Sequence, residues 1–167
     1  MDTMAERLIA HLGLAPHPNE GGWFVESYRA KPPLAFAGYD GRRAVSTGIY
    51  YLLTPETQSA MHLVASDEMF HFYLGDAVRQ LRLYPDGRSE TVVIGPDLLA
   101  GQAVQTVVPA GVWQGARLAP GGRFALMGCT VAPGFDYADY EHGARDELVQ
   151  GWPEAADAIR DLTPDSR

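Results

Sequence analysis

Residues 61–75 read MHLVASDEMFHFYLG and combine strand-forming residues with two histidines and a glutamate. Apolar, aromatic and β-branched residues lie on both sides of Ser66-Asp67, a pair that is typical of turns. The pattern predicts two strands, near 60–65 and 67–74, joined by a tight hairpin turn. In such a hairpin, Glu68 returns opposite the strand that carries His62.

Seven further segments on either side of this stretch share its strand pattern. They are rich in Val, Ile, Tyr, Phe and Thr and span residues 23–30, 44–53, 78–84, 89–94, 104–108, 112–118 and 123–132. Turn signals such as Asp40-Gly41 and Pro85-Asp86-Gly87 separate them. About nine strands with no helical pattern between them predict an all-β antiparallel sandwich or barrel. A βαβ fold would need crossover helices, and residues 44–132 contain no helical pattern.

Short helices are expected at the two ends of the chain. In residues 3–12, apolar residues recur at helical spacing and fall on one face. Residues 140–163 predict two short helical pieces, the second of which begins at Pro153. We therefore expect one domain over residues 1–167, with a barrel core at about 22–132.

Charge and composition exclude several classes of protein. The 167 residues, of which 46% are apolar and 20% charged, fit one globular domain. Lys and Arg total 13 against 21 Asp and Glu, which gives a net charge of -8. This charge argues against nucleic acid or an anionic membrane surface as a partner, because both are negatively charged. No segment approaches the roughly 20 apolar residues that span a bilayer.

The chain has a single cysteine, Cys129. One cysteine rules out an intrachain disulfide and a zinc site made of several thiolates. Cys129 lies in an apolar segment, so a buried structural thiol is expected. A free cysteine and an N-terminus without an export signal favour a cytoplasmic protein.

His62 and Glu68 are the first candidates for catalysis. Period-2 geometry places His62 and Val64 on one face of their strand and Leu63 on the other. If the hairpin forms, a histidine and a carboxylate meet inside the barrel and can act as base and acid. The alternative is a half-buried hairpin with a hydrogen-bonded histidine and a surface glutamate. Composition alone favours that alternative, since isolated His and Glu residues are common.

His71 is the third catalytic candidate, and its direction is open. Strict alternation from Glu68 places Phe70 and Phe72 on the glutamate's face and His71 on the opposite face. A β-bulge would reverse this assignment, and bulges recur near active sites. His71 is therefore either a pocket residue or a histidine packed outside the barrel.

Several further side chains are candidate ligand-binding residues. Tyr50 and Tyr51 are adjacent on one strand, so one of them lines the barrel and the other packs outside. We take Tyr50 as the candidate, together with Tyr28 and Arg29 on the first strand and with Trp113 and its neighbour Gln114. Arg29 can grip a phosphate or carboxylate, or it can be a surface ion-pair partner. Trp113 either walls the pocket or fills the core.

The stretch around His62 resembles the first sequence motif of the cupin superfamily, which has the form G-x5-H-x-H-x3,4-E-x6-G. The positions from the first histidine onward are filled by His62, Val64, Glu68 and Gly75. The copy is therefore degenerate, because valine stands where the motif has its second histidine.

Residues 102–118 resemble the second cupin motif, G-x5-P-x-G-x2-H-x3-N. Pro109 and Gly111 fit the motif, and Gln114 stands in the place of its histidine. The two motifs occur in order and several strands apart. Together they imply a cupin double-stranded β-helix, which is a jelly-roll barrel.

A narrower resemblance runs from about residue 12 to 141. Five blocks are similar to the cupin-5 group (DUF985), a family of unknown function. The blocks are PHPNEGGWFVESYR at 16–29, STGIYYLL at 46–53, SDEMFHFY at 66–73, VPAGVWQGA at 108–116 and GCTVAPGF at 128–135. The family implies a jelly-roll barrel, a homodimer and an internal pocket without an established ligand.

The resemblance also bears on metal binding. Metal-dependent cupins usually hold a divalent metal with three histidines and one carboxylate. At these positions the chain supplies His62, Val64, Glu68 and Gln114. Valine has no ligand atom, and an amide oxygen is a weak ligand for first-row transition metals. We therefore expect that no cofactor is required, with a weakly bound divalent metal at His62, Glu68 and Gln114 as the alternative.

Three functions follow as hypotheses. The first is a small-molecule-binding cupin that isomerises or epimerises a sugar or nucleotide-sugar without a metal, by analogy with jelly-roll deoxysugar epimerases. The second is a metal-dependent oxygenase or isomerase with a reduced ligand set. The third is a non-catalytic dimer that binds or senses a ligand.

A homodimer is expected on physical grounds as well. A β-protein must cover its edge strands or risk aggregation. The segment that contains Trp23 and Phe24 can add to a partner's sheet in a two-fold arrangement.

Overall fold

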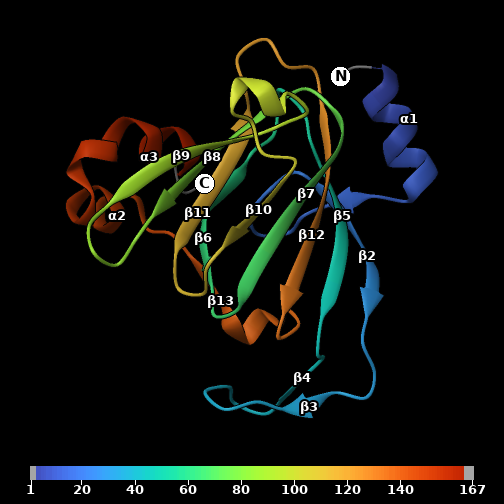
Figure 1. Cartoon of the computed structure of the whole chain (residues 1–167), viewed down its shortest axis with the longest axis vertical. Helices are drawn as coiled ribbons and strands as arrows, with labels where there is room; N and C mark the ends of the chain where they lie inside the picture. Colours follow the sequence, from blue (N-terminus) through green and yellow to red (C-terminus); the bar gives the residue numbers. More distant parts are fainter. Residues whose placement is uncertain (1–2, 164–167) are drawn as a thin grey trace.

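The computed structural model describes residues 3–163, and its main strands form two antiparallel sheets that face each other (Figure 1). The six-stranded sheet contains, in spatial order, β1 (Ala15–Pro16), β2 (Trp23–Arg29), β5 (Thr47–Leu53), β12 (Ala125–Ala132), β7 (Asp67–Gly75) and β10 (Gln105–Val108). The five-stranded sheet contains β13 (Tyr140–His142), β6 (Ser59–Val64), β11 (Trp113–Leu118), β8 (Val78–Leu83) and β9 (Ser89–Ile94). The predicted all-β class is confirmed.

All nine predicted strand segments are strands in the structure. The strand pattern did not predict β1, β13 or the two-stranded arm formed by β3 (Leu34–Ala35) and β4 (Arg42–Arg43). These four strands have two or three residues each, too few to show a period-2 pattern.

The predicted hairpin at Ser66-Asp67 is wrong. β6 pairs with β11 and β13, whereas β7 pairs with β12 and β10 in the other sheet. The chain thus crosses from one sheet to the other at this turn. His62 and Glu68 consequently lie on facing sheets rather than on neighbouring strands.

An apolar cluster to which both sheets contribute lies between them. The six-stranded sheet supplies Tyr51, Leu53, Phe70, Ala125, Met127 and Cys129, and the five-stranded sheet supplies Val78, Ile94, Ala116 and Leu118. These residues alternate along their strands with residues that face outward, as half-buried strands require. The cluster therefore defines the inner face of each sheet.

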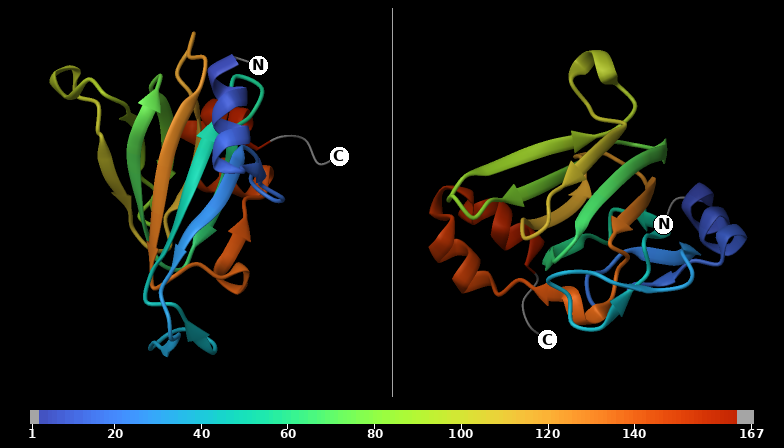
Figure 2. Two further views of the ribbon diagram at one scale, coloured as in Figure 1. Left: turned by 90° about the vertical axis from the view of Figure 1, so that its right-hand side faces the viewer. Right: turned by 60° about the horizontal axis from the view of Figure 1, so that its bottom comes forward.

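Helices cover the outer faces (Figures 1 and 2). The helix α1 (Thr3–Leu12) packs on the six-stranded sheet near Leu52 and Leu126. On the other side, α2 (Arg145–Gly151) and α3 (Ala156–Leu162) pack against Met61 and Leu83. Three short 3-10 turns complete the described secondary structure: Leu98–Ala100, Tyr137–Asp139 and Pro153–Ala155. Within residues 3–163, no helix is long and apolar enough to cross a bilayer.

The two ends of the chain were predicted with different success. The N-terminal helix has the predicted bounds. The C-terminal segment contains the predicted helices, but its first residues, Tyr140–His142, form the edge strand β13. This strand pairs with β6, whose backbone groups would otherwise lie unpaired at the sheet edge. The predicted domain bounds at residues 1–2 and 164–167 lie outside the described residues.

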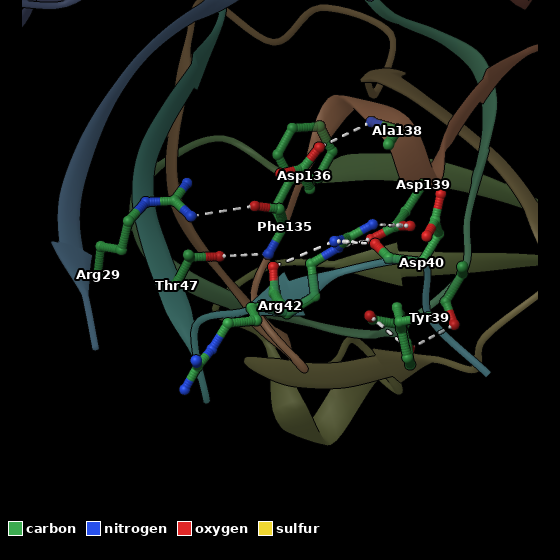
Figure 3. A network of polar contacts seen from close by, with 12 residues as sticks. Arg29, Tyr39, Asp40, Arg42, Thr47, Phe135, Asp136, Ala138 and Asp139 are labelled. Carbon is green, nitrogen blue, oxygen red and sulfur yellow. Dashed lines mark hydrogen bonds and ion pairs between the residues drawn. The ribbon is translucent and has the colours of Figure 1, made fainter. Parts of the chain in front are cut away.

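Polar contacts tie the β3–β4 arm to the barrel (Figure 3). Arg43 on β4 forms two hydrogen bonds with the carboxylate of Asp139, at 2.6 and 2.8 Å. The hydroxyl of Tyr39, between β3 and β4, donates to the carbonyl oxygen of Ala65 at 2.9 Å. These contacts join the arm to the turn that precedes β7 and to the one that precedes β13.

Candidate functional site

The inner face of the barrel carries a cluster of buried polar side chains. Glu68 lies on β7, His62 on β6 and Gln114 on β11, and their exposed fractions are 8%, 3% and 1%. The Nε2 of Gln114 donates a hydrogen bond to Oε2 of Glu68 at 2.7 Å. His62 and Gln114 are directly opposite in the β6–β11 ladder. The structure thus brings together the three residues that were predicted as a site.

Glu68 is a titratable group whose pKa is altered by its position in this cluster. Burial raises the pKa of the Glu68 carboxyl from 4.5 to about 7, because burial disfavours the charged form. His62 and the hydrogen bond from Gln114 act in the opposite direction and lower this pKa. Near neutral pH the carboxyl can therefore either hold or release a proton.

The ring orientation of His62 is set by the backbone. Its Nδ1 lies 2.8 Å from the carbonyl oxygen of Ala60, so Nδ1 carries the hydrogen and donates it. In the neutral ring, Nε2 is then the atom with a free electron pair. The ring of Tyr140 stacks on the ring of His62 at 5.5 Å between centroids. The imidazole ring of His62 is thereby held in place, with Nδ1 as its hydrogen-bond donor.

Gln80 and Arg82 on β8 extend the cluster, although neither was predicted as a site residue. The Nε2 of Gln80 donates to Oε1 of Gln114 at 3.2 Å, and Arg82 donates to Oε1 of Gln80 at 2.7 and 3.0 Å. Both side chains are almost fully buried. The signal was available: with Val78 they occupy alternate positions of one strand, and this places them on its inner face.

Glu20 and His17 form the other end of the cluster. One carboxylate oxygen of Glu20 lies 3.5 Å from Nδ1 of His62 and accepts from the Ser59 hydroxyl at 2.7 Å. The other lies 3.1 Å from Nε2 of His17. Burial lowers the pKa of His17. Both residues come from the loop before β2, so strand periodicity could not place them.

The inner-face tyrosine is Tyr51, and Tyr50 faces outward toward the cluster under α1. The hydroxyl of Tyr51 donates to the carbonyl oxygen of Gly21 at 2.8 Å. Burial raises the pKa of Tyr51 well above its usual value. Gly22, which follows Gly21, has φ of +73°, and a Cβ at this position would lie 2.8 Å from the Tyr51 hydroxyl oxygen. Tyr50, the predicted ligand-binding residue, therefore lies outside this cluster.

His71 also lies on the outer face of its strand. The pairing of β7 with β12 shifts register between Leu126 and Met127 of β12. Gly128 of β12 is the residue opposite His71, so the shift does not fall between Glu68 and His71. The imidazole Nε2 lies 3.1 Å from Oγ1 of Thr130, and its Nδ1 lies 3.1 Å from Nε2 of Gln105. The alternation that placed His71 opposite to Glu68 is thus the one observed.

The remaining candidates lie away from the inner cluster. Tyr28 is 58% exposed on the outer face of β2. Arg29 forms a hydrogen-bonded ion pair with Glu26, with 2.7 Å between its closest atoms, and donates to the carbonyl oxygen of Phe135. Trp113 packs with the apolar residues under α2 and α3. Of the two alternatives for Arg29 and for Trp113, the structure shows the ion-pair partner and the core residue.

The predicted metal positions do not assemble a metal-binding set of side chains. Val64 offers no ligand atom, and the amide of Gln114 is hydrogen-bonded at both ends, to Glu68 and to Gln80. Within residues 3–163, no three His, Cys, Asp or Glu side chains are grouped so that they could hold a metal ion. The residues present therefore do not fit the divalent metal of metal-dependent cupins.

Comparisons with known proteins agree with this architecture. The family described as "Cupin superfamily (DUF985)" matches residues 6–143. An uncharacterized protein of Saccharomyces cerevisiae is 32% identical over 147 residues, which are 81% of this chain and 73% of the yeast protein. The solved structure of a hypothetical protein from Leishmania major is 31% identical, with a TM-score of 0.87 over 96% of this chain and 99% of that one.

Two further solved structures differ in their similarity to this chain, and the more distant one shares the fold alone. A protein from Shewanella oneidensis is still 31% identical, with a TM-score of 0.86 over 97% of this chain and 98% of that one. By contrast, oxalate decarboxylase from B. subtilis is 13% identical, with a TM-score of 0.54 over 92% of this chain and 38% of the decarboxylase. The two facing sheets are thus those of a cupin jelly roll, and the chain belongs to the cupin superfamily, in the family described as DUF985.

Proposed function

We propose that the inner face of the barrel binds a small polar molecule and that His62 and Glu68 transfer a proton on it. The reaction class is an isomerisation or epimerisation beside a carbonyl group, and the substrate class is a sugar or nucleotide-sugar. The observation that carries this proposal is the pairing of a buried carboxyl whose pKa is about 7 with a histidine whose Nδ1 is fixed.

The roles follow from the protonation states. The free Nε2 of His62 removes a proton from the carbon beside the carbonyl group. The protonated carboxyl of Glu68 gives a proton to the carbonyl oxygen, so no net charge accumulates on the substrate. His62 then returns its proton to the same or the neighbouring carbon while the Glu68 carboxylate takes back a proton from an enol oxygen, which restores the carbonyl group, the base and the acid. Gln114 holds the carboxyl of Glu68 in position, and Tyr51 keeps its proton because its pKa is raised.

The chemistry needs no resident metal, since a histidine and a carboxyl supply the base and the acid. Metal content tests this part of the proposal. We expect elemental analysis of protein purified without a histidine tag or chelator to find substoichiometric metal, and His62→Ala to leave that amount unchanged. Stoichiometric zinc, manganese or iron that is lost in His62→Ala would instead support a metal-dependent oxygenase or isomerase.

The proton-transfer step is tested by solvent exchange. The protein is incubated in D2O with a panel of sugars and nucleotide-sugars, and the mass of each compound is followed. A substrate gains one mass unit when a carbon-bound hydrogen is exchanged. We expect His62→Ala and Glu68→Gln to lose the exchange, whereas His71→Ala, on the outer face, retains it.

Two outcomes would contradict the proposal. Exchange at the wild-type rate in His62→Ala would show that this histidine is not the base. A compound that raises the melting temperature but undergoes no exchange would support the non-catalytic ligand-binding function instead.

We place the protein in the cytoplasm, a proposal supported by the buried, unpaired Cys129.

A further inference from the structure

A groove of about 370 Å³ lies on the outer face of the five-stranded sheet, beside α3, which contributes Ala158, Asp161 and Leu162 to its lining. Its floor includes Leu81 and Leu162. Its rim is formed by the loop after β5, at Thr54 and Thr57, and by the turn after β11, at Gly121. The sheet separates this groove from the inner cluster, so it is a second and independent place for a ligand.

Two arginines line this groove side by side. Arg79 on β8 and Arg117 on β11 are directly opposite each other in the ladder between these strands. Their neighbours Val78, Gln80 and Ala116 are buried in the barrel, so both arginines face outward. Like charges that are directly opposite on a sheet repel and destabilise it. The register therefore places two positive charges side by side, at a cost to the stability of the sheet.

Little within residues 3–163 compensates this charge. The one carboxylate in the lining is Asp161, and its Oδ2 is 3.9 Å from Nη1 of Arg117 at the limit of an ion pair. The Asp161 side chain is 70% exposed, and exposed pairs of this kind contribute little. Arg79 makes no ion pair with any described residue. Two forked guanidinium groups are thus left with most of their donors available.

We propose that this groove binds a small molecule through an oxyanion, a phosphate ester or a carboxylate, held between Arg79 and Arg117. Each guanidinium can bind such a group through two parallel hydrogen bonds, and the anion removes the repulsion between the two side chains. The groove volume is that of a small-molecule site, and its apolar floor accommodates the uncharged part of the ligand.

Thermal unfolding with simple anions tests the proposal. Inorganic phosphate and succinate are titrated separately, each against sodium chloride at the same ionic strength. We expect at least one of them to raise the melting temperature beyond the chloride control, and to shift the backbone amide resonance of Gly121. A preference for phosphate assigns a phosphate ester as the ligand class, and a preference for succinate assigns a carboxylate.

Variants separate binding from folding. Arg79→Gln and Arg117→Gln should each weaken the anion's apparent affinity at least 10-fold. Without anion, Arg79→Gln should melt at or above the wild-type temperature, because it removes a like-charge pair. Arg88→Gln, at an exposed arginine in the turn between β8 and β9, is the matched control and should bind as wild type does. Stabilisation equal to that of chloride, or unchanged in Arg79→Gln, would overturn the proposal.

Discussion

The amide of Gln114 and the carboxyl of Glu68 are joined by a 2.7 Å hydrogen bond that runs from the five-stranded sheet to the six-stranded sheet. Both side chains are buried, and Oε1 of Gln114 accepts in turn from Gln80. The bond therefore links the sheets through the same carboxyl whose pKa is raised to about 7. The same hydrogen bond therefore contributes to the stability of the barrel and positions the carboxyl group that we propose as the acid.

Glu68→Gln should change how stability depends on pH. The pKa of Glu68 is about 7 in the folded chain and 4.5 in its ordinary environment. The folded state therefore keeps this proton while the unfolded chain releases it, and wild-type stability falls as the pH rises from 4.5 to 7. This loss is roughly 3 kcal/mol for such a shift. Glu68→Gln has no carboxyl group to titrate and does not lose this stability. The free energy of unfolding of the variant, relative to that of the wild type, should therefore increase by the same amount between pH 4.5 and pH 7.

Chemical denaturation at several pH values measures this difference. Glu147→Gln, at an exposed glutamate of α2, is the matched control. A difference between Glu68→Gln and wild type that stays constant from pH 4.5 to 7 would show that the Glu68 carboxyl is not buried in its neutral form.

Gln114→Leu should destabilise the protein and further raise the pKa of Glu68. The variant removes the hydrogen bond that lowers this pKa and leaves Glu68 and Gln80 without their partner. Leaving buried polar groups unpaired costs about 1–3 kcal/mol. Gln105→Leu, at an exposed glutamine on the outer face, should change stability by less than about 0.5 kcal/mol. Urea unfolding of both variants and carboxyl titration by NMR would check this, and equal effects of the two substitutions would contradict it.

Arg43→Gln should lower the melting temperature several times more than Arg29→Gln. The side chains of Arg43 and Asp139 are 5% and 9% exposed, whereas those of Arg29 and Glu26 are 39% and 42% exposed. Breaking a buried pair leaves a charge without compensation, while breaking an exposed pair leaves both charges in water. Differential scanning calorimetry at one pH makes the comparison. Equal melting temperatures of the two variants would show that the Arg43–Asp139 pair contributes no more to stability than the exposed Arg29–Glu26 pair.

A homodimer stays a prediction, but its contact region changes. Trp23 and Phe24 already pair with Pro16 and Ala15 of the chain's own β1, so that part of the β2 edge is covered. Large apolar side chains are exposed instead on the outer face of the six-stranded sheet. They are Tyr28, Tyr73, Leu74 and Val107. Exposed patches of this kind are typical of protein interfaces.

Light scattering after size exclusion measures the mass of the particle. We expect twice the chain mass of 18.2 kDa for the wild type at micromolar concentration. Tyr73→Asp should shift the particle toward the chain mass, whereas Tyr137→Asp, at a tyrosine that is also half-exposed but lies after β12, should not. A wild-type monomer would refute the dimer.

Local patterns in the chain were sufficient to predict the longer strands and which of their residues share a face. Alternation alone placed Glu68 and Phe70 on one face and His71 on the other, and it required Tyr50 and Tyr51 to separate, but it left open which residues point inward. These assignments depend only on neighbours within a strand, so they can be derived from sequence. Very short strands such as β13 escape this argument because two or three residues show no period.

The partners of the inner side chains depend on which strands meet across the barrel. The turn at Ser66-Asp67 looks like a hairpin locally, yet the chain changes sheets there, because β7 finds its hydrogen-bonding partners in β12 and β10. Only that crossing sets Glu68 against Gln114, and only the packing of the loop before β2 brings Glu20 to His62. Residue type and alternation are local properties, whereas burial, pKa and pairing arise from contacts between segments that lie far apart in the chain.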